Sequence, residues 1–151
     1  MIRGFLRAAM VLPFAALVLA LASGPAQPSE TIDITVVIEN LRSSSGDVRV
    51  ALWSRADGFT DPDAAVAEAG QKAHEGQVAF TFKGLTPGRY AIASFHDENG
   101  NGSFDRTFLG LPKEGLGFSN GARIFLGPPT FDAAAVEVAA ASRVLVVKLL
   151  Y

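Results

Sequence analysis

The sequence contains no cysteine in its 151 residues, which excludes disulfides, thiolate metal sites and an acylated cysteine anchor. Secreted domains often use disulfides for stability, so this chain must rely on its hydrophobic core, with whatever help a bound ion provides. Basic residues are also in the minority, with 13 Lys and Arg against 15 Asp and Glu for a net charge of −2, and no two of them are adjacent in the sequence. This composition disfavours a nucleic-acid partner and attraction to an anionic membrane.

Only one long apolar run occurs, and it lies near the N-terminus. Two arginines precede the apolar residues 8–19, and a small-x-small sequence suited to cleavage follows at residues 20–22. This order predicts a secretory signal peptide at residues 1–22, with cleavage as late as residue 26 as an alternative. We therefore expect a periplasmic or secreted protein.

The same run is too short for a membrane-spanning helix, which needs about 20 apolar residues. A Ser-Gly-Pro sequence at residues 23–25 interrupts it at once. We expect no membrane span after signal cleavage. The remaining chain predicts a flexible N-terminus at residues 23–30 and a single domain at residues 31–151.

Alternating apolar residues predict that most of this domain is β-structure. Period-two patterns rich in β-branched and aromatic residues indicate strands, and polar residues on the other face of several strands indicate antiparallel sheets. We predict an all-β fold, a seven-stranded antiparallel Greek-key sandwich with one short helix and a long Gly-rich loop. The predicted strands are residues 31–41, 48–53, 78–82, 89–95, 123–126, 134–138 and 143–150.

The short helix is predicted at residues 61–70. Asp61 is a suitable N-cap, Pro62 suits the first helical position, and Gly70 ends an alanine-rich run at residues 64–69. A helix of this length is not stable alone, so we expect it to lie over an edge or an end of a sheet.

The most specific pattern in the chain lies at residues 96–105. Oxygen-bearing side chains alternate there and precede a glycine that permits a sharp turn, in the D-x-[DN]-x-[DN]-G order of a calcium loop. A hard cation collects oxygens from alternate residues and one backbone carbonyl. We therefore predict a Ca²⁺ ion here. The expected ligands are the side chains of Asp97, Asn99, Asn101 and Asp105 and the backbone carbonyl of Ser103.

This loop is not an EF-hand, because Phe108 stands where the EF-hand has its last acidic ligand. It fits a shorter loop that closes on the ninth residue, Asp105. Only two expected ligands carry a formal charge unless Glu98 or Glu114 folds back, so we expect a weak Kd, on the order of 10⁻⁴–10⁻³ M. The alternative is a plain Asn-Gly turn that binds no ion.

A long connection, residues 97–121, carries this loop together with six large apolar residues. Connections longer than about 12–15 residues are usually functional, internally packed or disordered, and so many apolar residues disfavour disorder. Either these residues pack onto one end of the sandwich, or they form a recognition surface for a glycan, a peptide or a lipid. They are Phe104, Phe108, Leu109, Leu111, Leu116 and Phe118.

His96 beside an aspartate suggests a competing interpretation, a periplasmic hydrolase that uses His96 and the loop acids. Such chemistry needs a serine, a base and an acid within hydrogen-bond reach, with an oxyanion hole. Ser94 shares a strand face with His96, but no G-x-S-x-G elbow is present, and Ser119 lies in a Gly-Phe-Ser-Asn sequence. We assign no catalytic residue. We expect a non-enzymatic module that binds a protein or glycan ligand or serves envelope structure.

Six short motifs follow one another along the domain, at residues 46–52 (G-D-V-R-V-A-L), 85–91 (L-T-P-G-R-Y-A), 96–102 (H-D-E-N-G-N-G), 108–115 (F-L-G-L-P-K-E-G), 117–120 (G-F-S-N) and 128–131 (P-P-T-F). With these motifs the chain resembles a family of small secreted bacterial proteins, domain of unknown function 2141. The resemblance implies export and a sandwich similar to prealbumin-like and carboxypeptidase-regulatory-like domains. It implies no established activity.

Overall fold

The computed structural model describes residues 30–140 and 144–151, so the predicted signal peptide and nearly all of the predicted flexible N-terminus lie outside the described residues. In the described part, eight strands form two sheets. The strands are β1 (Ile32–Leu41), β2 (Asp47–Trp53), β3 (Ala67–Lys72), β4 (Gly76–Leu85), β5 (Gly88–Asp97), β6 (Gly115–Phe118), β7 (Val136–Val138) and β8 (Val144–Lys148).

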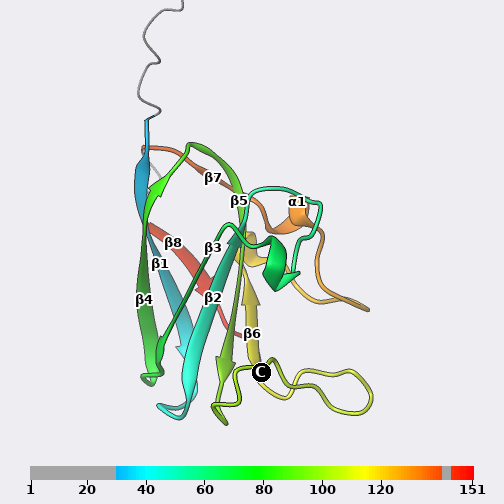
Figure 1. Ribbon diagram of the computed structural model, residues 1–151. Helices are drawn as coiled ribbons and strands as arrows, with labels where there is room; N and C mark the ends of the chain where they lie inside the picture. The colour runs from blue at the N-terminus through cyan, green and yellow to red at the C-terminus, as the bar shows by residue number, and fades with distance from the viewer. Residues whose placement is uncertain (1–29, 141–143) are drawn as a thin grey trace, which may run out of the picture.

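The two sheets face each other as a sandwich, which confirms the predicted all-β class (Figure 1). The smaller sheet has the order β4-β1-β8, and the larger has the order β3-β2-β5-β6, with β7 paired to β5. One pair departs from the antiparallel prediction, because β1 and β8 run parallel with Val36 opposite Leu145. Sequence alternation places residues on a face but does not give the direction of a partner strand.

The core between the sheets is built from the inward rows that alternation predicted. Side chains two apart point to the same face of a strand, and apolar ones gain stability by leaving water. The rows are buried on β1 (Ile34, Val36 and Ile38), β2 (Val48, Val50 and Leu52), β4 (Val78, Phe80 and Phe82) and β5 (Tyr90, Ile92 and Ser94), and the last row contains Val147 of β8 and Leu149 just after it.

The predicted helix at residues 61–70 is mostly wrong. Its start is confirmed, because Asp61 caps a single 3₁₀ turn at Pro62–Ala64 by accepting a hydrogen bond from the Asp63 N–H at 3.0 Å. The chain then becomes strand β3, in which Ala69 pairs with Val50 of β2. Alanine and glutamate favour a helix in isolation, but pairing with β2 at the sheet edge overrides that weak preference.

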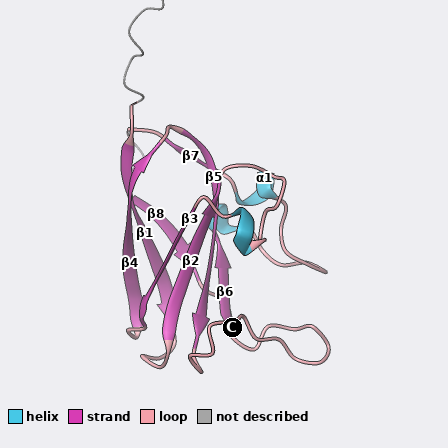
Figure 2. Ribbon diagram, in the orientation of Figure 1, coloured by secondary structure: helices cyan, strands magenta, loops and turns pink. Residues whose placement is uncertain are grey.

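The segment after β5 also differs from the prediction. The loop ends at strand β6 and a 3₁₀ turn at Ser119–Gly121, so the structureless connection is shorter than residues 97–121. Residues 123–126 are not a strand. A four-residue helix, α1 (Phe131–Ala134), follows with Thr130 as its N-cap (Figure 2). No helix among residues 30–140 and 144–151 is long and apolar enough to cross a membrane.

Candidate metal loop and ligand groove

Asp97 ends β5 and anchors the loop that follows. Its side chain is fully buried, and its two carboxylate oxygens accept the backbone N–H groups of Asn101 at 3.1 Å and Gly102 at 2.8 Å. The Nε of Arg49 lies 3.8 Å from the Asp97 Oδ2. The carboxylate therefore holds the turn in place by charge-assisted hydrogen bonds, with one cation at the limit of an ion pair.

The amide side chains of Asn99 and Asn101 complete the loop. The Asn99 Oδ1 accepts the Asn101 N–H at 2.9 Å, and the Asn101 Oδ1 accepts the Ser103 N–H at 2.8 Å, two successive Asx turns. Both Nδ2 groups donate to the Asp105 Oδ2, at 2.6 Å from Asn99 and 3.1 Å from Asn101. The structure thus brings the four predicted side-chain ligands into one turn. Ser103 joins it through its backbone N–H.

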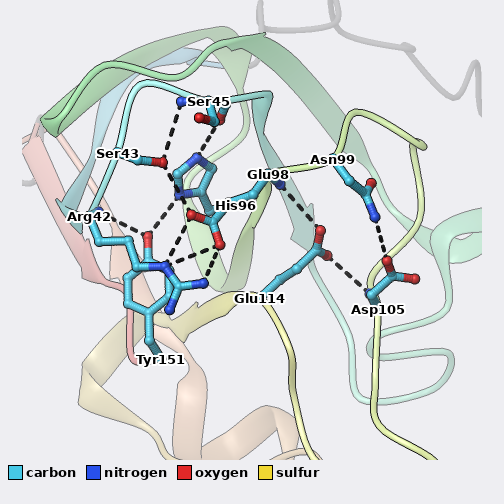
Figure 3. Close-up of polar contacts among 9 residues, drawn as sticks. All are labelled: Arg42, Ser43, Ser45, His96, Glu98, Asn99, Asp105, Glu114 and Tyr151. Carbon is cyan, nitrogen blue, oxygen red and sulfur yellow. Dashed lines mark hydrogen bonds and ion pairs between the residues drawn. The ribbon is translucent and has the colours of Figure 1, made fainter.

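Glu114 folds back onto this loop, as the sequence allowed. It is 4% exposed, and its two oxygens accept the N–H groups of Glu98 at 3.2 Å and Asp105 at 3.0 Å (Figure 3). Glu114 therefore ties the two ends of the loop together. Within the described ranges, no three His, Asp or Glu side chains are grouped so that they form a metal site by themselves. A cation in this loop would depend on the amide oxygens as well.

His96 lies beneath the loop with both ring nitrogens engaged. Its Nε2 is 2.7 Å from the Ser45 carbonyl oxygen and its Nδ1 is 2.8 Å from the Tyr151 hydroxyl (Figure 3). Because a carbonyl only accepts, Nε2 carries the proton and Nδ1 accepts from Tyr151. The ring is completely buried. His96 therefore fixes the residue 42–46 loop and Tyr151 against the end of β5.

The serines of the hydrolase hypothesis are engaged elsewhere. The Ser94 hydroxyl donates to the Arg49 carbonyl at 2.7 Å, and the buried Ser119 hydroxyl donates to the Ala134 carbonyl and accepts the Ile92 N–H. Neither hydroxyl is hydrogen-bonded to the imidazole of His96. The geometry thus provides no nucleophile–base pair from these residues.

Arg42 and Glu98 form an ion pair close to His96 (Figure 3). The Arg42 guanidinium donates to the Glu98 carboxylate from Nη2 and from Nε, and Nε lies 3.0 and 3.1 Å from the two carboxylate oxygens. The Ser43 hydroxyl also donates to this carboxylate, at 3.1 Å. The hydrogen bond from Arg42 is the main reason that the pKa of Glu98 is lowered. The same guanidinium stacks on the Tyr151 ring at 4.3 Å, and burial raises the pKa of that phenol.

This ion pair predicts an acid-sensitive contribution to stability. Because the folded-state pKa of Glu98 is lowered from 4.5, its carboxylate stabilises the fold above that pH, and the effect is lost as pH falls through the folded value. We expect Glu98→Gln to cost about 1 kcal/mol at pH 7 and much less in acid, since the pair is partly exposed to solvent. Urea unfolding at both pH values measures this. The exposed Glu75→Gln is the control, and an equal loss in acid would contradict the assignment.

A groove of about 990 Å³ lies on the outer face of the larger sheet, next to the loop. Its floor contains Arg49 and Ala51 of β2 and Ala93 and Phe95 of β5. Phe104, near the end of the metal loop, packs edge-on against Phe95 with ring centroids 5.7 Å apart. The loop thereby forms one wall. The other lining residues include Gly102, Ser103, Arg106, Leu109, Leu111, Leu116, Phe118, Ile124 and Leu126.

A second apolar cluster covers the same face beside the groove. Phe59 packs edge-on against Trp53 at 5.4 Å, Phe131 at 5.9 Å and Phe118 at 6.2 Å between ring centroids. Trp53 is only 4% exposed and belongs to the interior of this cluster. The larger sheet is therefore apolar on both faces.

The comparisons with known proteins concern a region that includes both the loop and the groove. A family model described as an uncharacterised protein conserved in bacteria (DUF2141) matches residues 36–145. The chain belongs to this family. The resemblance drawn from the six motifs is thereby confirmed, and the DUF2141 match extends from within β1 to within β8. No curated protein and no solved structure matches the chain.

Sequence patterns predicted the residue 97–105 loop of this DUF2141 domain, but they did not predict the groove. Arg49 and Arg106 come from a strand and a loop that are far apart in sequence, so no local spacing relates them. One signal was present: both rows of β5 are apolar, with Ala91, Ala93 and Phe95 opposite the core-facing row. A strand that is apolar on both rows is typically covered on both faces.

Proposed function

We propose that this domain is a non-enzymatic binding module of the bacterial cell envelope. In this proposal the groove binds a small amphiphile with an apolar body and an acidic group, and the residue 97–105 loop binds Ca²⁺. One observation carries the proposal: Gly102, Ser103 and Phe104 of the loop line the groove. An ion in the loop would therefore fix the wall against which the ligand packs.

The ligand class follows from the lining. The groove has the volume of a small-molecule site, since such pockets typically measure about 300–1,000 Å³. Its surfaces are mainly aliphatic and aromatic, with the guanidinium groups of Arg49 and Arg106 set against the single carboxylate of Glu68. Arg106 lies over the Phe104 ring at 5.3 Å. Within the described part of the chain it makes no ion pair, so in this proposal it pairs with the acidic group of the ligand. These properties favour an apolar anion over the protein or glycan partner that the sequence alone suggested.

The case for calcium rests on the oxygen set and on the burial of Asp97. Two carboxylates and two amides meet in one turn, and a flexible set of oxygens suits Ca²⁺ better than Mg²⁺, which demands near-ideal octahedral geometry. Binding would require the amides of Asn99 and Asn101 to present oxygen where their nitrogens now donate to Asp105. A bound cation would also compensate the fully buried charge of Asp97, whose cationic neighbour Arg49 is 3.8 Å away.

Groove binding is tested with anilinonaphthalene sulfonate, a fluorescent apolar anion. We expect saturable binding, weakened at least about tenfold by Ala93→Phe, because the larger ring fills the floor of a site of this size. Arg106→Gln should weaken binding of palmitate and leave binding of uncharged hexadecanol unchanged. Ala79→Phe is the control, since Ala79 lies exposed on β4, outside the groove. Equal loss in both phenylalanine variants would contradict the assignment of the groove.

Calcium binding is tested separately by calorimetric titration of the chain from residue 23 onward. We expect heat of binding with a Kd on the order of 10⁻⁴–10⁻³ M. The absence of both heat and a thermal shift at millimolar Ca²⁺ would mean that the loop is a plain turn. Groove binding of the dye would remain measurable in that case, so the two parts of the proposal fail independently.

A further inference from the structure

Two seven-residue segments of the chain share one pattern. Residues 106–112 read R-T-F-L-G-L-P and residues 123–129 read R-I-F-L-G-P-P, so Arg, Phe, Leu, Gly and Pro recur in the same order and spacing. Neither segment is a strand. The structure places each copy in a loop, the first between β5 and β6 and the second between β6 and α1. We call the two copies the paired tips.

Each tip presents its Phe-Leu pair to solvent. Phe108 is 96% and Leu109 70% exposed in the first tip, and Phe125 is 87% and Leu126 98% exposed in the second. Leu126 also adopts a left-handed backbone with φ 56°, which is unfavourable for leucine. Folding gains nothing from a strained, fully exposed leucine. Large apolar residues that are clustered and exposed in this way mark an interaction surface.

Defined turns hold the tips in place. In the first, the Thr107 N–H donates to the Leu111 carbonyl at 2.7 Å and the Gly110 N–H donates to the Thr107 carbonyl at 2.9 Å. In the second, the Phe125 N–H donates to the Gly127 carbonyl at 3.2 Å. Both loops extend away from the larger sheet on the same side (Figure 1), and residues of both line the same groove. The paired tips therefore act as one surface.

The surface is locally basic, although the whole chain is acidic. Arg106, Lys113 and Arg123 flank the apolar pairs, and all three are exposed. No Asp or Glu occurs in residues 106–113 or in residues 115–131. The net charge of −2 led to the expectation that anionic membranes would not attract this protein. The net charge is an average over the whole chain, and it does not show that basic residues are concentrated in these two loops.

We propose that the paired tips dock the protein on a lipid bilayer that contains anionic lipid. Phe108, Leu109, Phe125 and Leu126 would enter the boundary between headgroups and acyl chains, while the flanking cations lie among the phosphates. A second copy of this chain is a poorer occupant, because association through the tips would bring like charges together. Docking goes beyond the proposed groove ligand and does not depend on it.

Co-sedimentation with vesicles tests the docking. Wild type should bind vesicles of phosphatidylcholine with phosphatidylglycerol, much less those of phosphatidylcholine alone, and progressively less as salt is raised. The double variant Phe108→Ser/Phe125→Ser should lose at least about tenfold in binding, since the inserted apolar surface is removed. Lys113→Gln/Arg123→Gln should reduce the preference for phosphatidylglycerol. Val66→Ser/Val146→Ser is the matched control, because these valines are each 51% exposed and belong to neither tip.

Loss of membrane docking can be distinguished from loss of groove binding. Phe108 and Phe125 do not line the groove, so the serine double variant should bind anilinonaphthalene sulfonate as wild type does. Both the full chain and the chain from residue 23 onward are measured, because the apolar residues 8–19 can themselves enter lipid. Failure of wild type to bind, or equal binding by the serine double variant, would overturn the proposal. Sedimentation showing a dimer that the serine double variant dissociates would instead identify a second copy as the occupant.

Discussion

Replacement of Asp97 by alanine should lower the free energy of unfolding by about 3 kcal/mol and abolish any stabilisation by calcium. The buried carboxylate accepts the N–H groups of Asn101 and Gly102, and hydrogen bonds to a charged acceptor contribute about 1.5–3 kcal/mol each. The strands should remain folded, because a small domain commonly has about 5–15 kcal/mol of stability. Urea unfolding with and without Ca²⁺ measures both effects.

The calcium effect in wild type has an expected size. At free Ca²⁺ about tenfold above its dissociation constant, binding should stabilise the fold by about 1.4 kcal/mol, which raises the Tm by about 5 °C. Asp47→Ala is the matched control: this aspartate forms an exposed ion pair with Lys72 at 3.1 Å, so it should cost less than about 1 kcal/mol and leave the calcium response intact. A calcium-dependent rise in Tm that persists in Asp97→Ala would show that the ion binds elsewhere.

Replacement of Gly46 by alanine should be still more damaging, with a loss of about 4 kcal/mol. Gly46 has φ +70°, and a Cβ there would lie 1.9 Å from the carbonyl oxygen of Asp97. The Asp97 oxygen is a backbone atom and the new Cβ is fixed to the backbone, so neither can turn aside. The backbone at one strand end must therefore move, and strain of this kind causes losses of this size. Because Asp97 itself is displaced, calcium binding should weaken together with stability. Chemical denaturation and calcium titration of the same variant report the two effects.

Gly84→Ala separates steric contact from backbone preference. Gly84 has φ +71°, nearly the value at Gly46, but a Cβ there would meet no atom within 4 Å. Its cost should therefore be the conformational cost alone, about 1–2 kcal/mol. If both alanine variants lose the same amount, the close approach of Gly46 to Asp97 does not contribute, and the loop is less tightly packed than the structure indicates.

Regular alternation was sufficient to predict the strands that have a solvent face. β1, with Ile34, Val36 and Ile38 alternating with polar or less buried neighbours, is an example. β3 was missed because the only apolar residues of A-E-A-G-Q-K are two alanines, which favour a helix in isolation, and its extended form depends on pairing with β2. β6, G-L-G-F, is only four residues long and has two glycines. Gly117 is required there, since a Cβ would lie 2.4 Å from the Lys148 carbonyl, a contact no local pattern predicts.

The same distinction applies to the candidate sites. The residue 97–105 loop is local, so the spacing of Asp97, Asn99 and Asn101 was sufficient to predict that their side chains would share one turn. The groove is non-local, because it brings Arg49 of β2 together with Arg106, which lies in the loop after β5 and far from Arg49 in sequence. Apolar residues of residues 97–121 were expected either to pack or to form a surface, and both occur: Phe104 and Phe118 pack, whereas Phe108, Leu109 and Leu111 are exposed.

The parallel pairing of β1 with β8 has a consequence for how the protein acquires its structure. The first strand of the smaller sheet, β1, has β4 on one side and β8 on the other, so that sheet stays incomplete until residues 144–148 have been synthesised. Contacts between such distant segments slow folding, because a large loop must close before any are made. A polypeptide that folds late stays unfolded for longer, and an unfolded chain can pass through a translocation channel. If the chain crosses a membrane as proposed, this delay would keep it competent for translocation.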